Sequence, residues 1–292
     1  MSLRIAVASG KGGTGKTTVA ANLARVFGSP VQLVDCDVEE PNLGFFIGGA
    51  SLGCETVTVP TPVVEPSLCD GCGLCAEACQ FGAIAVTRSR PLVFPELCHG
   101  CGGCSRACPR GAIREAGHRI GVVESFASGS VLRLEGRLDV GRPAAPPLVR
   151  AVKQRIRPGP AILDAPPGTS CPVVATVRGS DLVVLVSEPT AFGLHDLGLA
   201  VQMVRSLGLG CGVVVNRVGL GDARVQRYCE TEGLPLLAEI PDDRRVAEAY
   251  SRGELMLDAV PGYRALFEGL LARIRELCAR RPFASVPAGG AA

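Results

Sequence analysis

The 292-residue sequence has few aromatic residues and no tryptophan: aromatics make up 4% of the chain, against 47% for all hydrophobic residues. A core of the size that this length allows must therefore be built mainly from Val, Leu, Ile and Ala. Short aliphatic runs of this kind are typical of parallel strands that are buried on both faces of a sheet. The length suits one sizeable α/β domain with a smaller domain attached.

A dominant charge is also missing. The 30 basic and 28 acidic side chains leave a formal net charge of +2, so the composition does not indicate a surface for a phosphate backbone. We therefore expect no nucleic-acid partner. No run approaches the roughly 20 apolar residues of a spanning helix, and the first residues resemble a strand instead of an export leader. We expect a cytoplasmic protein in a reducing compartment.

Six short aliphatic runs alternate with segments of helical periodicity. The runs cover residues 3–8, 31–37, 161–168, 181–190, 211–218 and 235–243, and the helical patterns cover 17–27, 193–207, 222–232, 244–252 and 263–280. This alternation predicts right-handed crossovers and a doubly wound, mostly parallel sheet in an α/β fold. Ligands of such sheets bind beyond the carboxyl ends of the strands, where the polar residues of these runs lie.

The alternation stops near residue 60 and resumes near residue 118. Eight of the fourteen cysteines lie in this interval, in two copies of the spacing C-x2-C-x2-C-x3-C that begin at Cys69 and Cys98. The proline-containing segment 58–67 before them is expected to be a loop, and 118–124 a returning strand. We therefore expect a discontinuous larger domain at 1–60 and 117–281, a small inserted domain at 61–116, and a loose tail at 282–292.

A phosphate-binding loop is indicated directly after the first strand. Residues 10–17 fit the pattern G-x4-G-K-[ST] at the start of the first helix. Backbone N–H groups of such a loop surround phosphate oxygens, and the helix N-terminus adds a partial positive charge. The residues expected to bind ATP or ADP are Gly10, Gly12, Gly13, Thr14, Gly15, Lys16, Thr17 and Thr18. Lys16 is expected to reach the β and γ phosphates, and Thr17 to ligate Mg²⁺.

The loop contains a second lysine, Lys11. The stretch KGGTGKTT resembles the deviant Walker A motif of the MinD, Mrp, ParA and nitrogenase iron protein group, which are P-loop NTPases of the SIMIBI type. That resemblance implies an ATP-bound homodimer in which Lys11 crosses the interface to the partner's nucleotide, much as an arginine finger does. A lysine that merely solvates its own loop is the alternative.

Other residues at strand ends match the order of the family's landmarks. The resemblance assigns Asp37 to positioning the attacking water and Asp164 to holding magnesium through water. It places Asn216 and Arg217 at the adenine-reading position, and Pro241 and Asp243 in the loop around the base. Each alone would be an ordinary cap or turn residue. Together they imply a Mg²⁺-dependent ATPase that is slow without its partner.

The cysteine motifs resemble those of bacterial two-cluster ferredoxins, in which the fourth cysteine of each run ligates the other cluster. The resemblance implies an inserted ferredoxin-like α+β domain with two 4Fe-4S clusters. The implied ligand sets are Cys69, Cys72, Cys75 and Cys108 for one cluster, and Cys98, Cys101, Cys104 and Cys79 for the other. Gln80 replaces the usual proline of the first run. Zinc, which also accepts paired C-x2-C units, is the competing interpretation.

These resemblances imply a dimerising ATPase that is coupled to two clusters and acts in electron transfer or metallocofactor handling, with a redox or metallocofactor protein as partner. The alternative is a spatial organiser like MinD or ParA with structural or redox-sensing clusters. MinD-type proteins attach to membranes through a terminal amphipathic helix, and here an apolar stripe on the last expected helix is formed by Leu266, Leu270, Ile274 and Leu277. A stripe of this kind usually faces the core, so membrane binding is not expected. A cluster-assembly scaffold like Mrp would need a C-x2-C pair outside the insert, and the sequence has none.

Overall fold

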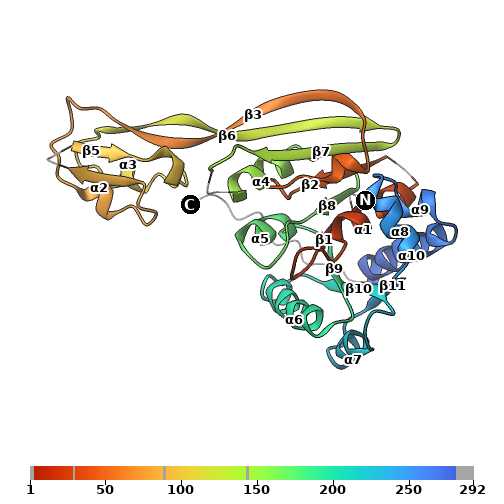
Figure 1. Cartoon of the computed structure of the whole chain (residues 1–292). Coiled ribbons are helices and arrows are strands. Elements are labelled where there is room, and N and C mark those ends of the chain that lie inside the picture. Colours follow the sequence, from red (N-terminus) through yellow and green to blue (C-terminus); the bar gives the residue numbers. More distant parts are fainter. Residues whose placement is uncertain (1–2, 29, 88–89, 143–144, 281–292) are drawn as a thin grey trace.

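The computed structural model describes residues 3–28, 30–87, 90–142 and 145–280, so the tail expected at 282–292 lies outside the described residues. Nine strands of the described chain form one sheet in the order β11-β10-β9-β1-β8-β2-β7-β6-β3 (Figure 1). They are β1 (Arg4–Ala8), β2 (Val31–Asp35), β3 (Ala50–Val64), β6 (Ile113–Ser128), β7 (Val131–Leu138), β8 (Ala161–Asp164), β9 (Leu182–Ser187), β10 (Cys211–Val218) and β11 (Leu236–Pro241). In this order, every neighbouring pair of strands from β11 through β7 is parallel. Strand β6 is antiparallel to both of its neighbours, β7 and β3. The predicted mostly parallel α/β sheet is confirmed.

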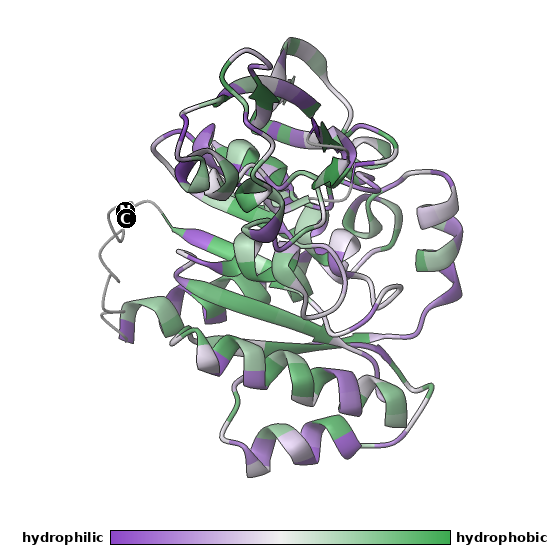
Figure 2. Cartoon of the chain, turned by 90° about the vertical axis from the view of Figure 1, so that its left-hand side faces the viewer, coloured by the Kyte–Doolittle hydropathy of each residue, from purple (hydrophilic) through white to green (hydrophobic). Residues whose placement is uncertain are grey.

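Helices cover both faces of the sheet. One face carries α1 (Lys16–Val26), α8 (Arg244–Ser251), α9 (Met256–Ala259) and α10 (Tyr263–Arg280), and the other carries α4 (Ala145–Gln154), α5 (Cys171–Val177), α6 (Ala191–Ser206) and α7 (Arg224–Thr231). Each face of the sheet has its own hydrophobic core, and successive residues of β1 alternate between the two cores. Ile5 and Val7 lie in one core, and Ala6 and Ala8 lie in the other. The central parallel strands are therefore largely hydrophobic in Figure 2, whereas the helices also carry hydrophilic residues.

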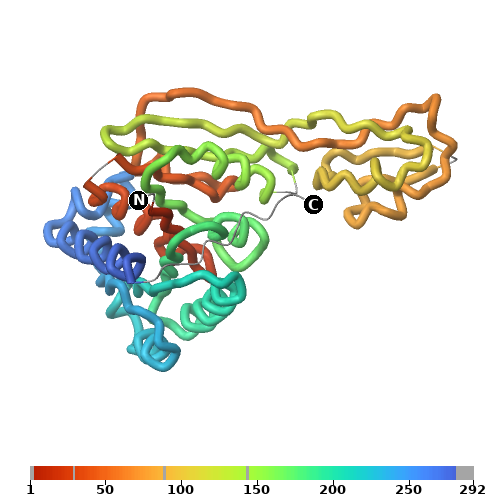
Figure 3. The backbone as a smooth tube through the Cα atoms, turned by 180° about the vertical axis from the view of Figure 1, so that it is seen from behind, coloured from red at the N-terminus to blue at the C-terminus, as the bar shows by residue number. Residues whose placement is uncertain are grey.

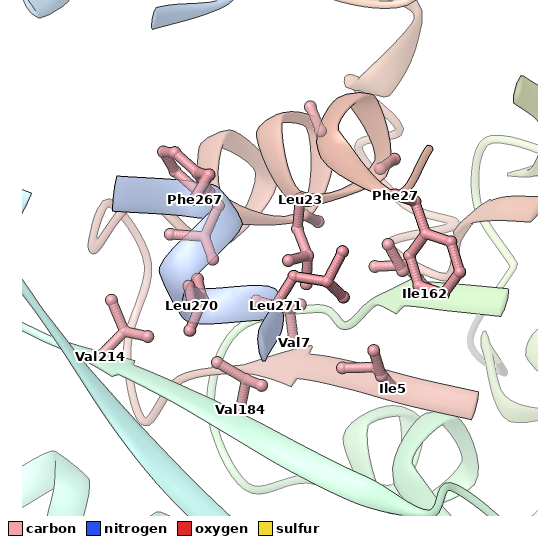
Figure 4. Close-up of a cluster of buried hydrophobic side chains, with 14 of the residues drawn as sticks. Ile5, Val7, Leu23, Phe27, Ile162, Val184, Val214, Phe267, Leu270 and Leu271 are labelled. Carbon is pink, nitrogen blue, oxygen red and sulfur yellow. The ribbon is translucent and has the colours of Figure 1, made fainter. Parts of the chain in front are cut away.

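The last helix packs its apolar stripe onto the core beside α1. Leu271 of α10 meets Leu23 of α1 above β1 (Figure 4). Leu270 and Ile274 are 1% and 0% exposed, and the flanking leucines of the stripe pack partly buried against the same core. The stripe therefore faces the core, as expected. No helix in the described ranges combines the length and the apolar character needed to cross a membrane.

Strands β3 and β6 form a long antiparallel pair that extends beyond the sheet and carries residues 65–112, which we call the cysteine lobe (Figures 1 and 3). The expectation of a loop at 58–67 is wrong, because β3 continues to Val64, which pairs with Ile113. Pro60 and Pro62 fit this strand because β3 is the last strand of the sheet, and a proline at an edge need not break a ladder hydrogen bond. The predicted domain boundaries at 60/61 and 116/117 fall within β3 and β6.

The cysteine lobe contains α2 (Leu74–Glu77), α3 (Gly103–Ala107), a short 3-10 turn at Pro95–Leu97, and a two-stranded sheet of β4 (Ile84–Thr87) and β5 (Arg90–Val93). Each helix follows a glycine in the left-handed conformation, Gly73 at φ 86° and Gly102 at φ 71°. An L-residue would be strained at either position. These glycines turn the chain tightly between successive cysteines of each motif.

Strand β7 was not predicted from the sequence, because Arg133 and Glu135 interrupt its aliphatic pattern. The structure buries both side chains, at 5% and 3% exposure, as an ion pair. The Arg133 guanidinium also lies 4.0 Å from the centre of the Phe126 ring on β6. The ion pair along β7 and the contact of Arg133 with Phe126 thus make two buried charges acceptable in a strand that sequence reasoning leaves out.

Candidate functional site

The phosphate-binding loop connects β1 to α1 and is shaped by two left-handed glycines. Gly13 has a φ of 76° and Gly15, at the N-cap of α1, a φ of 95°. A Cβ on Gly15 would lie 2.4 Å from Nδ2 of Asn216, which donates a hydrogen bond to the carbonyl of Thr14 at 2.8 Å. The Thr14 side chain is buried, and its Oγ1 has no hydrogen-bond partner. The loop therefore combines exposed backbone at Gly12 and Gly13 with a buried hydroxyl that has no hydrogen-bond partner.

Asp164 lies at the end of β8, between β1 and β2, and is 1% exposed. Burial raises the pKa of Asp164 to about 7, although a hydrogen bond from Thr17 and the charge of Lys16 both lower it. Burial also lowers the pKa of Lys16, while Asp164 and Asp37 raise it. Oδ1 of Asp164 has no hydrogen-bond partner. A lysine, a threonine hydroxyl and an incompletely satisfied carboxylate thus meet at the carboxyl edge of the sheet, and these oxygens suit Mg²⁺.

Asp35 shapes the loop that presents Asp37. Its buried carboxylate accepts hydrogen bonds from the backbone N–H groups of Asp37, Asn42 and Leu43 at 3.0–3.1 Å. Burial and then the neighbouring Asp164 raise the pKa of Asp35 well above its usual value, and these three hydrogen bonds oppose the shift. Asp37 is less buried, and burial raises its pKa while Lys16 lowers it. The structure therefore brings Asp37 to the predicted site and gives Asp35 a backbone role.

Lys11 contacts its own chain. Its Nζ lies 3.0 Å from Oε2 of Glu188, and Nη1 of Arg217 lies 2.7 Å from Oε1 of the same carboxylate. Glu188 follows β9 and is 8% exposed. Sequence reasoning did not select Glu188. The residue belongs to the stretch SEPTAFGLHDL (187–197) at the end of β9, which resembles the family's sequence at this point.

The residues expected around the adenine fall into two neighbouring groups. Asn216 lies against the phosphate-binding loop, and the Arg217 guanidinium is paired with Glu188. Pro241 and Asp243 line a separate hollow together with Tyr263, whose hydroxyl donates to Asp243 at 3.3 Å. Asp243 also accepts a hydrogen bond from the backbone of Arg245 as the N-cap of α8. The Arg245 guanidinium lowers the pKa of Asp243 to about 2.

The cysteine lobe contains two hollows, and each holds four of the eight motif cysteines. The first is lined by Cys69, Cys72, Cys75 and Cys108, and the second by Cys79, Cys98, Cys101 and Cys104. Backbone N–H groups donate to three of these sulfurs: Ala83 to Cys79, Gly100 to Cys98 and Ala112 to Cys108, at 3.3–3.4 Å. Each hollow thus contains one predicted ligand set, three cysteines from one motif and the fourth from the other.

The thiols are not arranged around a single point. Within the described ranges, no three His, Cys, Asp or Glu side chains converge as the ligands of one metal ion do. Four sulfurs on tetrahedral zinc would have to meet at about 2.3 Å from one centre.

Comparisons with known proteins agree with the fold and with the phosphate-binding loop. The family model for the CobQ/CobB/MinD/ParA nucleotide binding domain matches residues 5–256. An uncharacterized protein of Methanocaldococcus jannaschii is 32% identical over 225 residues, which cover 75% of this chain and 80% of that protein. An iron-sulfur cluster carrier protein of Aquifex aeolicus is 26% identical over 281 residues, or 88% of this chain and 62% of that protein.

Among solved structures, the septum site-determining protein MinD from Pyrococcus horikoshii, complexed with Mg-ADP, superposes with a TM-score of 0.60 at 22% identity. The match covers 96% of this chain and 98% of that chain, and at this identity it supports the fold alone. The family model extends from β1 to the start of α9, which includes the phosphate-binding loop and the acidic strand ends. The chain therefore belongs to the CobQ/CobB/MinD/ParA nucleotide binding domain family.

Proposed function

We propose that the chain is a Mg²⁺-dependent ATPase that dimerises with ATP and is coupled to two 4Fe-4S clusters in the cysteine lobe, in electron transfer or metallocofactor handling. The observation that carries this proposal is the crossed origin of the cysteines: each hollow takes three from one motif and the fourth from the other. Two-cluster ferredoxins share this arrangement. The similarity to a relative named as an iron-sulfur cluster carrier supports the same chemistry.

The nucleotide half of the proposal depends on the loop at 10–18 and the acids beside it. In this proposal, Lys16 and the loop N–H groups bind the phosphates. Thr17 ligates Mg²⁺, and Asp164 holds the ion through water. Asp37 positions the attacking water. The unpartnered Thr14 Oγ1 and Asp164 Oδ1 support this assignment, because buried oxygen atoms without partners favour a polar ligand.

Base recognition is assigned to Asn216, Arg217, Pro241 and Asp243 together. The two groups are joined through the backbone, since the N–H of Asp242 donates to the carbonyl of Val218 at 2.9 Å. Arg217 then contributes mainly through its backbone, because its guanidinium is committed to Glu188. In this proposal the adenine binds beside the phosphate-binding loop and the hollow at Tyr263.

The cysteine lobe provides what a resident cluster needs. When bound, a 4Fe-4S cluster accepts or donates one electron. The chain supplies four thiol ligands in each hollow and N–H groups that stabilise negative charge on the sulfurs, a feature that tunes the reduction potential. Of the eight ligands Cys72 and Cys101 are exposed and only Cys75 is buried, so a bound cluster would lie near the surface, within reach of a docked redox partner. We assign the ferredoxin-like domain to residues 61–116, and the ATPase domain to 1–60 and 117–281.

A second copy of the chain has a suitable face around Lys11. Phe192 at the start of α6 is 79% exposed and Leu220 after β10 is 60% exposed. The loop that carries Leu220 contacts Pro189, because a Cβ on Gly221 would lie 1.7 Å from the Pro189 carbonyl oxygen. Large apolar side chains exposed beside a charged rim are typical of protein interfaces, and homodimers bury such a face symmetrically.

The redox or metallocofactor protein is expected to dock on the cysteine lobe. Six large apolar side chains are exposed there: Leu68, Leu74, Phe81, Leu92, Phe94 and Leu97. Phe81 stacks on His99 with ring centres 3.9 Å apart at the wall of the second hollow. The lobe and the nucleotide site are joined through β6, which pairs with β3 at the lobe and with β7 in the main sheet.

The spatial-organiser alternative is not favoured. In its MinD-like form it would use an amphipathic terminal helix to bind a membrane, and the apolar stripe of α10 is packed in the core.

The decisive experiment is anaerobic purification of the full chain with and without ATP and Mg²⁺. We expect about eight iron and eight sulfide per chain, paramagnetic signals after reduction, and a change from one copy to two with ATP. Lys16→Ala is the control, because without the phosphate-binding lysine neither oligomer size nor the signals should respond to ATP. A preparation without iron, or one that stays a single copy with ATP, contradicts the proposal.

A further inference from the structure

A third hollow lies beside the two that contain the motif cysteines, and the proposed function does not use it. It is formed where strand β5 lies beside the extended ends of β3 and β6 (Figure 1), and it holds about 670 Å³ of empty space. Binding sites for small molecules typically hold about 300–1,000 Å³. The hollow is therefore large enough for a ligand of one or two rings.

The walls of this hollow come from two strand faces. Side chains alternate between the two faces of a strand, and Pro91, Val93 and Pro95 line one wall from alternate positions of β5 and the turn that follows it. On the other wall, Thr61 of β3 pairs with Ala116 of β6. The hollow is thus a slot with mainly aliphatic walls, a shape that suits a flat ring.

Two polar side chains interrupt the aliphatic walls. His118 pairs with Val59, two positions along the ladder from Thr61, so Thr61 and His118 lie on the same face of the β3–β6 pair. Thr61 is 5% exposed, and neither its Oγ1 nor the Nε2 of His118 has a hydrogen-bond partner among the described residues. Buried polar atoms without partners are rare and favour a ligand that supplies them. Both atoms can donate a hydrogen bond to an oxygen atom of that ligand.

The lining also limits the charge of the ligand. No Asp, Glu, Lys or Arg is among the described residues that line the hollow. A phosphate or a nucleotide would therefore lack a counter-ion inside it, and an unpaired charge in an apolar site is costly. A neutral ring with carbonyl oxygens fits both the aliphatic walls and the two polar atoms.

This hollow is adjacent to both cysteine hollows. Pro62 lines it and also the hollow that holds Cys98, whereas Val64 and Pro91 line it and also the hollow that holds Cys69. Single side chains thus separate it from each of the other two. A neutral ring that has two carbonyl oxygens and also carries electrons is a quinone.

We propose that this hollow binds a quinone-type ring between β5 and the β3–β6 pair, with Thr61 Oγ1 and His118 Nε2 as hydrogen-bond donors to its carbonyl oxygens. The aliphatic walls pack on the two faces of the ring, and the two hydrogen bonds fix its orientation. The choice of a redox-active ring rests on the proposed clusters, whereas binding depends only on the residues that line the hollow.

The first test measures binding of duroquinone to the anaerobically purified full chain by equilibrium dialysis. Methyl groups occupy all the ring carbons of duroquinone that thiols would attack, so the fourteen cysteines do not add to it. Thr61→Val and His118→Phe keep the bulk of each side chain and should each raise the dissociation constant about fivefold, the value of one hydrogen bond. Thr58→Val is the matched control, because Thr58 is exposed on the opposite face of β3, and its binding should equal that of the wild type. Absence of binding to the wild type, or equal binding in all four proteins, overturns the proposal.

The second test separates a binding role from a structural one. Thr61 Oγ1 has no hydrogen-bond partner among the described residues, so Thr61→Val should leave the thermal unfolding midpoint without duroquinone unchanged or higher. Duroquinone should raise the midpoint of the wild type and of Thr58→Val by the same amount, and that of Thr61→Val by less. A lower midpoint in Thr61→Val with unchanged affinity for duroquinone would mean that the hydroxyl serves the fold, and would overturn the proposal.

Iron content distinguishes a failure of this inference from a failure of the proposed function. A chain purified without iron that binds duroquinone with the expected variant effects contradicts the proposed function and supports the binding site. A chain that carries iron and does not bind duroquinone overturns the binding site alone.

Discussion

Gly15 provides a quantitative test of how the phosphate-binding loop is held. An alanine at Gly15 must adopt a φ of 95°, and its Cβ would lie 2.4 Å from Nδ2 of Asn216. Because Asn216 must move, its hydrogen bond to the Thr14 carbonyl at 2.8 Å is lost. Gly13 is the matched control: its φ is 76°, and a Cβ there would meet no atom within 4 Å.

The two substitutions therefore differ by the Asn216 contact. A left-handed conformation costs an L-residue about 1–2 kcal/mol, and leaving a buried carbonyl without its donor costs about 1–3 kcal/mol more. We expect Gly13→Ala to lower the free energy of unfolding by about 1–2 kcal/mol and Gly15→Ala by about 2–5 kcal/mol. Equilibrium urea denaturation without nucleotide measures both values.

Asn216→Ala removes the obstructing amide. In that background the effect of Gly15→Ala should fall to that of Gly13→Ala, since only the backbone conformation still differs. Two results would refute the reasoning: equal losses of stability for the two glycine variants, or an undiminished loss for Gly15→Ala in the Asn216→Ala background. Either result would mean that Asn216 does not hold the loop.

Three further predictions concern other parts of the molecule. Cys69→Ser and Cys108→Ser should remove the same paramagnetic signal, because both cysteines line the first hollow. Cys98→Ser should remove the other signal, because Cys98 lines the second hollow. If Cys108→Ser instead removed the signal that Cys98→Ser removes, the crossed ligand sets would be contradicted. Ile274→Ala, at a position 0% exposed, should lower the free energy of unfolding by about 2–5 kcal/mol in urea, and a loss below about 1 kcal/mol would argue against burial of the α10 stripe. The pKa of Asp243 is lowered to about 2 from 3.8, so its charge stabilises the fold above pH 3.8 and this contribution disappears as the pH falls through 2. The difference in urea midpoint between the wild type and Asp243→Asn should therefore shrink as the pH falls from 3.8 to about 2. A difference that stays constant over this pH range would contradict the lowered pKa of Asp243.

Much of the sheet could be predicted from local patterns. Aliphatic runs and helical periodicity located β1, β2, β8, β9, β10 and β11 to within a few residues. Most of these strands are buried on both faces, so their sequences are nearly continuous hydrophobic runs that need no tertiary information to recognise; β11, at the sheet edge, exposes Glu239 and Pro241. The phosphate-binding loop was equally local, because its glycines and its lysine lie within eight residues.

Part of β6 was expected as a strand over residues 118–124, whereas β3 and β7 depended on their neighbours. Strand β7 contains Arg133 and Glu135, which become compatible with a buried strand only when they pair with each other. Strand β3 contains Pro60 and Pro62, which are tolerated because no further strand pairs beyond it. The packing of Arg133 against Phe126 on β6 and the position of β3 at the sheet edge are not visible in the sequence of either strand, since both concern what lies beside the strand.

The sequence by itself determined the chemistry of this protein: a loop for phosphates, acids at strand ends, and two runs of thiols at ferredoxin spacing. The tertiary structure decided which of these groups meet. It placed Glu188 between Lys11 and Arg217, and Asn216 against a loop 202 residues away. The physical reason is that spacing along the chain encodes turns and periodicity, whereas contacts between distant strands depend on the order in which the strands pair.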